Sequence, residues 1–144
     1  YPEGIRGTFK YYKDVYKLGS FGRPDYARFA LKHSAPVIPF VMVGCAEIYP
    51  IFGKLNWNWV QQGLEWPCLP ITPTFPFFLL PLPTKWHLQV LPPVDPVAAI
   101  AEAERTGREP YQVIAGKVKK AIEDATAEML ANRKSLFLGN VFPE

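Results

Sequence analysis

The sequence is poor in the residues that hold metals and disulfides. It contains two cysteines and two histidines among 144 residues, and none of the four falls at the spacing of a metal-ligand cluster. We therefore predict no metal site. Cys45 and Cys68 lie far apart without the spacing of a disulfide pair, so we expect free thiols in a reducing compartment.

Long apolar stretches and several familiar catalytic motifs are also missing. No signal peptide is visible, and no apolar run approaches the ~20 residues that are needed to span a bilayer. A serine nucleophile elbow, a P-loop and a dinucleotide-binding fingerprint are all absent. Because the sequence starts at Tyr1 and opens directly on a motif, we expect it to be a fragment of a longer protein.

The composition is that of a folded domain with a mild positive charge. The chain is 49% hydrophobic and 15% aromatic, which suits one domain with a core and excludes a disordered chain. A net charge of +3 is too weak to indicate nucleic-acid binding. Basic residues exceed acidic ones in the first 33 positions, which suits either an anionic headgroup or phosphorylated substrate, or a solvated surface. The basic residues are Arg6, Lys10, Lys13, Lys17, Arg23, Arg28 and Lys32.

The first seven residues, Tyr1 to Gly7, place a carboxylate and a guanidinium around a glycine. Gly4 lets the backbone approach a ligand closely, and Arg6 offers a planar fork of donors suited to phosphate or carboxylate. Glu3 is placed to orient that fork or to accept a hydrogen bond from a ligand hydroxyl. Taken alone, the same residues also fit a surface turn with an exposed ion pair worth under ~1 kcal/mol.

This opening segment resembles the Phe-Pro-Glu-Gly-Thr-Arg-Ser motif of the glycerolipid acyltransferases, the family that includes the lysophosphatidic acid acyltransferases. The resemblance implies that Glu3, Gly4 and Arg6 bind a phosphoglycerol acceptor. Ile5 stands where the family usually has threonine, so one hydroxyl contact is absent here. The resemblance also implies a second phosphate contact from Lys17, which precedes Leu18-Gly19; a solvated lysine fits the same position.

A second match to this family begins at Pro36. Pro36-Val37-Ile38-Pro39 resembles the proline-valine-x-proline motif that lies beside the active cleft, and residues 22–47 resemble members related to diacylglycerol acyltransferases. Pro36 and Pro39 are therefore implied to shape the substrate site through the backbone. Both prolines also fit the start of an ordinary strand, where a missing donor costs least.

The fold that we predict is α/β, a partial and mainly parallel sheet flanked by helices and followed by a C-terminal helical segment. A helix begins near Asp25 and ends by Ser34, with Tyr26, Phe29, Ala30 and His33 as its buried face. Residues 36–44 form an uninterrupted apolar run, typical of a parallel strand covered on both faces. Helix followed by buried strand is half of a right-handed crossover unit.

The C-terminal third is expected to be helical. Residues 86–91 alternate apolar and polar side chains, which predicts a half-buried strand, and Asp95-Pro96 then opens a helix over residues 97–104 that breaks at Gly107. A second helix is predicted over residues 111–132. We assign residues 1–95 to the acyltransferase α/β domain and 96–144 to helices packing on it. The buried face of the second helix comprises Ile114, Val118, Ile122, Ala125 and Met129.

Between residues 49 and 86 the chain is rich in aromatic residues and proline. The prolines exclude a long regular helix across residues 67–83. Tryptophan suits the boundary between water and lipid, so this segment is expected either to dip into one leaflet, or to line an acyl groove, or to fold back on its own core as an ordinary loop. All four tryptophans fall between Trp57 and Trp86.

The resemblance implies a membrane-associated O-acyltransferase on the cytoplasmic face. It would move a fatty acyl group from acyl-CoA or acyl carrier protein to the hydroxyl of a lysophospholipid or similar glycerolipid, with no metal or organic cofactor. The family's catalytic base, in a His-x-x-x-x-Asp motif, is expected upstream of Tyr1, since His33 and His87 have Ile38 and Pro92 at the aspartate position. The fragment alone is therefore expected to be inactive. The alternative is a non-catalytic lipid-binding or interaction domain on the same scaffold.

Overall fold

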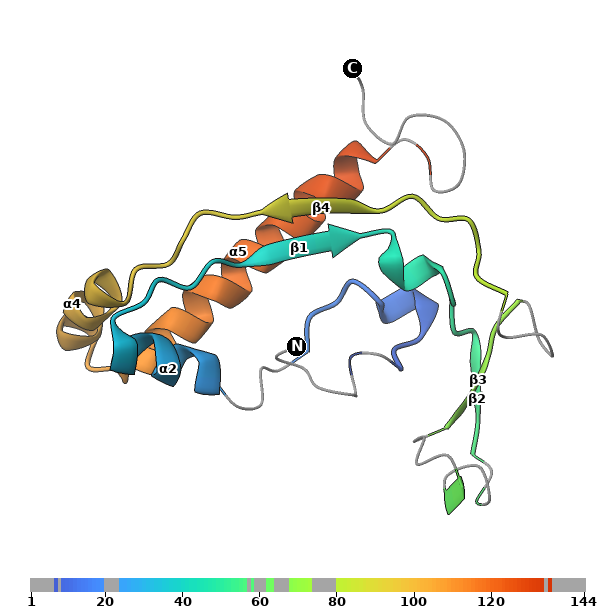
Figure 1. Cartoon of the computed structure of the whole chain (residues 1–144), viewed down its shortest axis with the longest axis horizontal. Helices are drawn as coiled ribbons and strands as arrows, with labels where there is room; N and C mark the ends of the chain where they lie inside the picture. Colours follow the sequence, from blue (N-terminus) through green and yellow to red (C-terminus); the bar gives the residue numbers. More distant parts are fainter. Residues whose placement is uncertain are drawn as a thin grey trace.

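The computed structural model describes residues 7, 9–19, 24–56, 58, 62–63, 68–73, 80–133 and 135. Glu3, Gly4 and Arg6, the predicted acceptor-binding residues, lie outside these ranges, so their roles stay predictions. Figure 1 shows the arrangement of the elements. In chain order they are η1 (Tyr12–Asp14), α2 (Asp25–His33), β1 (Phe40–Val43), η2 (Cys45–Glu47), β2 (Gly53–Leu55), β3 (Leu69–Ile71), β4 (His87–Val90), α4 (Pro96–Thr106) and α5 (Pro110–Asn132).

The strands of the described chain form two separate two-stranded sheets, both antiparallel. β1 pairs with β4 in a register that sets Phe40 opposite Val90 and Val43 opposite His87. Beyond the strands, Val37 and Val94 form an isolated antiparallel bridge in which the register is shifted by one residue. The prediction of a mainly parallel sheet is therefore wrong.

The error has a physical cause in the apolar run at residues 36–44. An uninterrupted apolar strand predicts cover on both faces, as parallel strands have. Instead, α5 packs on one face of β1, while Phe40 on the other face is more than half exposed. The chain leaves β1, forms the β2–β3 ladder and returns as β4 in the opposite direction, so the strands that the structure describes form no crossover unit.

α5 joins two apolar clusters and crosses the sheet behind β1 and β4 in the view of Figure 1. Its first half packs on α2 and α4, and its second half packs on the sheet. The predicted inner face of this helix is confirmed, because four of its five residues are buried and Ile122 contacts both clusters. The first cluster contains Ala27, Ala99, Ala103, Val113, Ile114 and Val118, and the second contains Val41, Val43, Leu91, Ala125 and Met129.

The predicted helix ends are confirmed by their capping geometry. Asp95 Oδ1 accepts a hydrogen bond of 2.9 Å from the Val97 N–H, and Pro96 occupies the first turn of α4. Gly107 ends α4 with a positive φ of 66°, a conformation that glycine adopts at little cost. α2 ends at His33 with Ser34 as its C-cap, in agreement with the end by Ser34 that Pro36 predicts.

The buried face predicted for α2 is only partly right. Ala30 is buried, as is Ala27, and Tyr26 is partly buried. Phe29 and His33, however, are exposed and pack on each other with their ring centroids 5.3 Å apart. The small residue Ala27, and not an aromatic ring, therefore packs in the cluster that α2 shares with α4 and α5.

The proline-rich segment contains the β2–β3 ladder, in which Lys54 lies opposite Pro70. The described residues between 67 and 83 hold no helix, in line with the proline argument. Most of the tryptophans and phenylalanines that suggested a lipid contact lie outside the described residues, so that role stays a prediction. Over the described ranges, we find no helix with the length and apolar character that crossing a membrane requires.

Candidate functional site

The described residues among those predicted to contact substrate lie near different ends of β1. Pro36 and Pro39 precede the strand, where the Pro39 carbonyl accepts a 2.9 Å hydrogen bond from the Leu91 N–H. Lys17 follows Tyr16, whose hydroxyl reaches Gly44 just beyond the other end. At roughly 3.3 Å per residue, Pro39 and Gly44 are ~16 Å apart along an extended strand.

Lys17 itself is exposed and already has an anionic partner. Its Nζ lies 2.7 Å from Asp14 Oδ1, and this ion pair lowers the pKa of the Asp14 carboxyl. Its backbone carbonyl accepts a hydrogen bond from the Lys10 ammonium. Lys17 is thus held on a basic surface segment, where a phosphate would compete with Asp14 for its charge.

A buried polar cluster brings together three residues that are remote in the sequence: Tyr16, Glu47 and Arg133. Glu47 is 1% exposed, and the side chain of Arg133 is 14% exposed. Arg133 Nη1 lies 2.7 Å from Glu47 Oε1, while the Tyr16 hydroxyl donates a short hydrogen bond to Glu47 Oε2. We call these three residues the Glu47 cluster.

The local backbone explains why Glu47 turns inward. β1 ends at Val43, and Gly44 follows with a φ of 100° that turns the chain into η2. A Cβ at this position would lie 1.9 Å from the carbonyl oxygen of Lys85, so only glycine fits. The turn places Glu47 in the interior, and the Gly44 N–H donates a 2.9 Å hydrogen bond to the Tyr16 hydroxyl.

The Glu47 cluster is electrostatically balanced. Burial raises the pKa of Tyr16 well above its usual range, and the hydrogen bond to the Glu47 carboxylate raises it further, so the phenol stays neutral. For Arg133, burial acts to lower the pKa, but the contacts with Glu47 and Tyr16 outweigh it and the pKa is raised. The cluster therefore contains one anion, one cation and one neutral donor.

This arrangement fixes structure and does not suit proton transfer. Both carboxylate oxygens of Glu47 are occupied by donors, and the residue has almost no contact with solvent. A general base needs a free lone pair within reach of a substrate proton. The neighbouring Cys45 is not an activated nucleophile either, because burial and the Glu47 charge raise the pKa of its thiol.

The cluster connects three parts of the fold. Tyr16 belongs to the segment after η1, Glu47 ends η2, and Arg133 follows directly on α5. A second link, the 2.9 Å hydrogen bond from the Tyr12 N–H to the Ile51 carbonyl, holds the same N-terminal segment. These contacts hold residues 9–19, which follow the predicted acceptor motif in the sequence, close to the end of β1.

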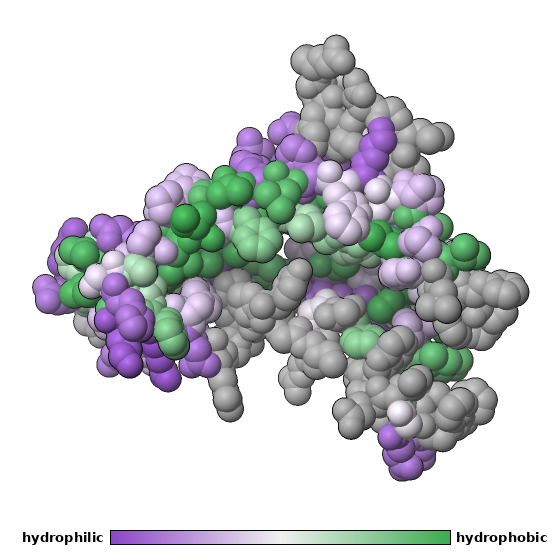
Figure 2. Space-filling view, in the orientation of Figure 1, coloured by the Kyte–Doolittle hydropathy of each residue, from purple (hydrophilic) through white to green (hydrophobic). Residues whose placement is uncertain are grey.

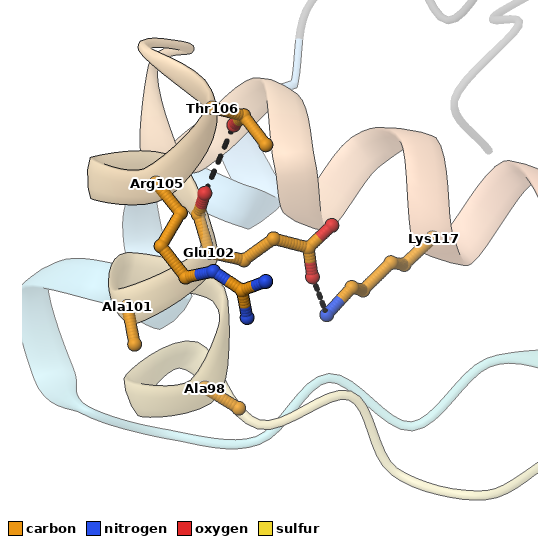
Figure 3. A pocket seen from close by; sticks show the side chains of 6 residues that line it. All are labelled: Ala98, Ala101, Glu102, Arg105, Thr106 and Lys117. Atoms are coloured by element: carbon orange, nitrogen blue, oxygen red, sulfur yellow. Dashed lines mark hydrogen bonds and ion pairs between the residues drawn. The ribbon is translucent and has the colours of Figure 1, made fainter.

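An open pocket lies elsewhere, between α4 and α5, with a volume of about 570 Å³. An ion pair between Glu102 and Lys117 crosses it, and Arg105 extends into the same recess (Figure 3). Of the residues that the structure describes, neither Lys17, Pro36 and Pro39 nor the Glu47 cluster is among those that line it. Across the part of the chain that the structure describes, no three His, Cys, Asp or Glu side chains gather to hold a metal ion.

Comparison with known proteins gives relatives but no family. No protein-family model matches the chain. No solved structure shows a significant match. The chain is similar to uncharacterized proteins of Mycobacterium tuberculosis (strain ATCC 25618 / H37Rv) and Mycobacterium bovis, at 32% identity over 145 residues that cover 96% of this chain and 39% of each relative.

A further uncharacterized protein, from Mycobacterium leprae, is 32% identical over 146 residues, which cover 96% of this chain and 38% of the relative. The chain thus spans about two fifths of the length of the curated relatives that it matches. The similarity extends over nearly all of this chain, so it takes in the strands and helices described above.

Proposed function

We propose that the natural protein containing this chain is a membrane-associated glycerolipid O-acyltransferase. In this reaction the acceptor hydroxyl oxygen attacks the thioester carbonyl carbon of acyl-CoA or acyl carrier protein. The new ester bond forms, the carbon–sulfur bond breaks, and the hydroxyl proton passes to a base while the thiol leaves. This chain contributes acceptor binding, and the base belongs to the part of the protein upstream of Tyr1.

One observation carries the proposal: the opening segment, with Glu3, Gly4 and Arg6 at the spacing of the acyltransferase acceptor motif. A guanidinium binds a phosphate through paired, charge-assisted hydrogen bonds. Pro36 and Pro39 add a second match to the same family at a later position. The direction of the sheet does not enter this argument, because the motif residues act through their own chemistry.

The fold adds indirect support through the segment that follows the motif. Hydrogen bonds of Tyr12 and Tyr16 hold residues 9–19 against the chain that follows β1. The segment that directly follows the motif therefore has a defined position in the fold. Lys10, Lys13 and Lys17 lie in this segment, and a phosphate or an anionic membrane surface would be attracted to them.

The test is acceptor kinetics in the full-length natural protein. Acyl transfer from an acyl-CoA to lysophosphatidic acid is measured for the wild type and for Arg6→Ala. Loss of a charge-assisted contact worth ~1.5–3 kcal/mol should raise the acceptor KM by roughly 10- to 100-fold, while the donor KM stays unchanged. Arg108→Ala is the matched control, because Arg108 is an exposed arginine in the α4–α5 connection.

Three results would decide against parts of the proposal. An unchanged acceptor KM in Arg6→Ala removes Arg6 from the acceptor site. An equal loss in Arg108→Ala shows that the effect is general electrostatics. Lysophospholipid binding without any turnover supports the alternative, a lipid-binding or interaction domain on the same scaffold.

A further inference from the structure

The sheet formed by β1 and β4 has its two faces covered unequally. Val41 and Val43 point to α5, where they are buried together with Ala125 and Met129. The alternation of side chains along a strand sends Phe40 and Met42 to the opposite face, and the register sets them against Val90 and Leu88. The same alternation adds Ile38 and Trp86, the residues flanking the strands. We call this set the outer face: Ile38, Phe40, Met42, Trp86, Leu88 and Val90.

The outer face is apolar and open to solvent. Five of its six residues are more than half exposed, and Met42 is partly exposed. Figure 2 shows a hydrophobic patch over the region that β1 and β4 occupy in Figure 1. Soluble proteins seldom present aromatic and aliphatic side chains side by side in this way unless something binds there.

The distribution of polar residues in β4 also indicates that the outer face is covered in the complete protein. Its polar residues His87 and Gln89 are directed to the α5 side, opposite Val43 and Val41, while Leu88 and Val90 are directed outward. An antiparallel sheet with one wet face normally turns its polar residues to the water. Here that pattern is reversed, which is expected only when the outward face is also covered in the complete protein.

The relatives indicate what covers it. They match this chain over 96% of its length, including β1 and β4, yet about three fifths of each relative lies outside the match. A two-stranded sheet is also marginal by itself, and in the described fold β1 and β4 pair only with each other as strands. Additional polypeptide would cover the face and could pair with an edge.

From these observations we infer that the outer face is the internal packing surface for the rest of the same polypeptide, the part that the mycobacterial relatives carry outside the matched region. The sheet then lies in a three-layer arrangement, with α5 on one face and the remaining polypeptide on the other. The inference is independent of the proposed enzymatic function, since it rests on side-chain burial and on chain length.

The test is thiol labelling of the full-length natural protein, with two valines of equal exposure in the described fold. Val90 is 62% exposed on the outer face, and Val97 is 63% exposed on α4. Val90→Cys should react with a maleimide on the order of 100-fold more slowly than the same variant unfolded in urea, because covered thiols react only through local opening. Val97→Cys should react almost as fast folded as unfolded. Peptide mapping separates these signals from Cys45 and Cys68.

Leu88→Cys provides a second probe on the same strand if Val90→Cys fails to fold. Protection of either outer-face thiol in a monodisperse monomer, without lipid, supports the inference. Labelling as fast as Val97→Cys overturns it, as does equal protection of both positions. Protection that disappears on dilution identifies a second copy as the occupant, and protection that appears only with anionic phospholipid vesicles identifies a membrane; both results overturn packing within one polypeptide.

Discussion

The buried ion pair between Glu47 and Arg133 gives the most quantitative prediction for the fold. Glu47→Gln keeps the shape of the side chain but removes its charge. The Arg133 guanidinium then loses its anionic partner at a position where only 14% of the Arg133 side chain is exposed. Removing one partner of a buried pair costs roughly 3–5 kcal/mol. Because Arg133 keeps some access to water, we expect the lower end, ~3 kcal/mol of unfolding free energy.

The assay is urea denaturation of the natural protein, followed by far-ultraviolet circular dichroism. With an m-value of ~1.5 kcal/mol per molar urea, a loss of ~3 kcal/mol lowers the midpoint by about 2 M. Glu123→Gln is the control, since Glu123 forms an exposed pair with Lys119 at 3.7 Å on the surface of α5. Exposed pairs of this spacing contribute only ~0.3–0.5 kcal/mol.

A double-mutant cycle separates the pair from general effects. Arg133→Gln should be destabilising alone, but it should cost much less in the Glu47→Gln background, giving a coupling energy of at least ~1.5 kcal/mol. The reasoning is refuted if Glu47→Gln is no more destabilising than Glu123→Gln. It is also refuted if the two substitutions at positions 47 and 133 are additive.

Three further predictions concern single positions. The folded-state pKa of Tyr16 is raised above the unfolded value of 10.0, so its stabilising contribution is complete below pH 10 and is lost as the pH rises further. The difference in unfolding free energy between wild type and Tyr16→Phe should therefore shrink above pH 10 in alkaline denaturation curves. A constant difference would contradict this. Gly44→Ala should abolish folding or cost several kcal/mol, because its Cβ would overlap the Lys85 carbonyl. Gly107→Ala has open space around it and should cost only ~1–2 kcal/mol for its positive φ. Similar urea midpoints for the two variants would contradict the clash at Gly44. Asp95→Ala should lower the free energy of unfolding by ~1 kcal/mol through loss of the α4 cap, as measured by urea denaturation. An unchanged midpoint would show that the cap does not stabilise the fold.

The helices were predictable because their signals are local. Asp95 and Pro96 define the start of α4 by capping chemistry, and Pro36 limits the end of α2 by steric exclusion. The inner face of α5 follows from apolar side chains at helical spacing, and the packing of Ile114 and Met129 agrees with that pattern. Each of these features depends on residues within a few turns of one another.

The sheet was not predictable in the same way. The apolar run at residues 36–44 correctly indicated a strand, but hydrophobicity on both faces does not state what covers each face. β1 has α5 on one side, and its outer face carries Phe40 and Met42 without a described partner. The direction of β4 relative to β1 depends on the path of the chain between residues 44 and 86. The alternation of apolar and polar residues in β4 separates its two faces, but it does not determine which face packs on α5.

The Glu47 cluster was missed for a related reason. A single carboxylate directly after an apolar strand indicates a buried charge that needs a partner. The chain contains 16 lysines and arginines, and nothing near Glu47 in the sequence selects Arg133 among them. The partner is determined by the path of α5 across the sheet, which brings residue 133 to the end of β1.

The most direct test of the functional proposal is the release of free CoA from palmitoyl-CoA by the purified full-length protein, with and without lysophosphatidic acid. The proposal predicts release that depends on the acceptor and is matched mole for mole by newly formed phosphatidic acid. Release at the same slow rate with and without acceptor, and no new ester in the lipid extract, would contradict it.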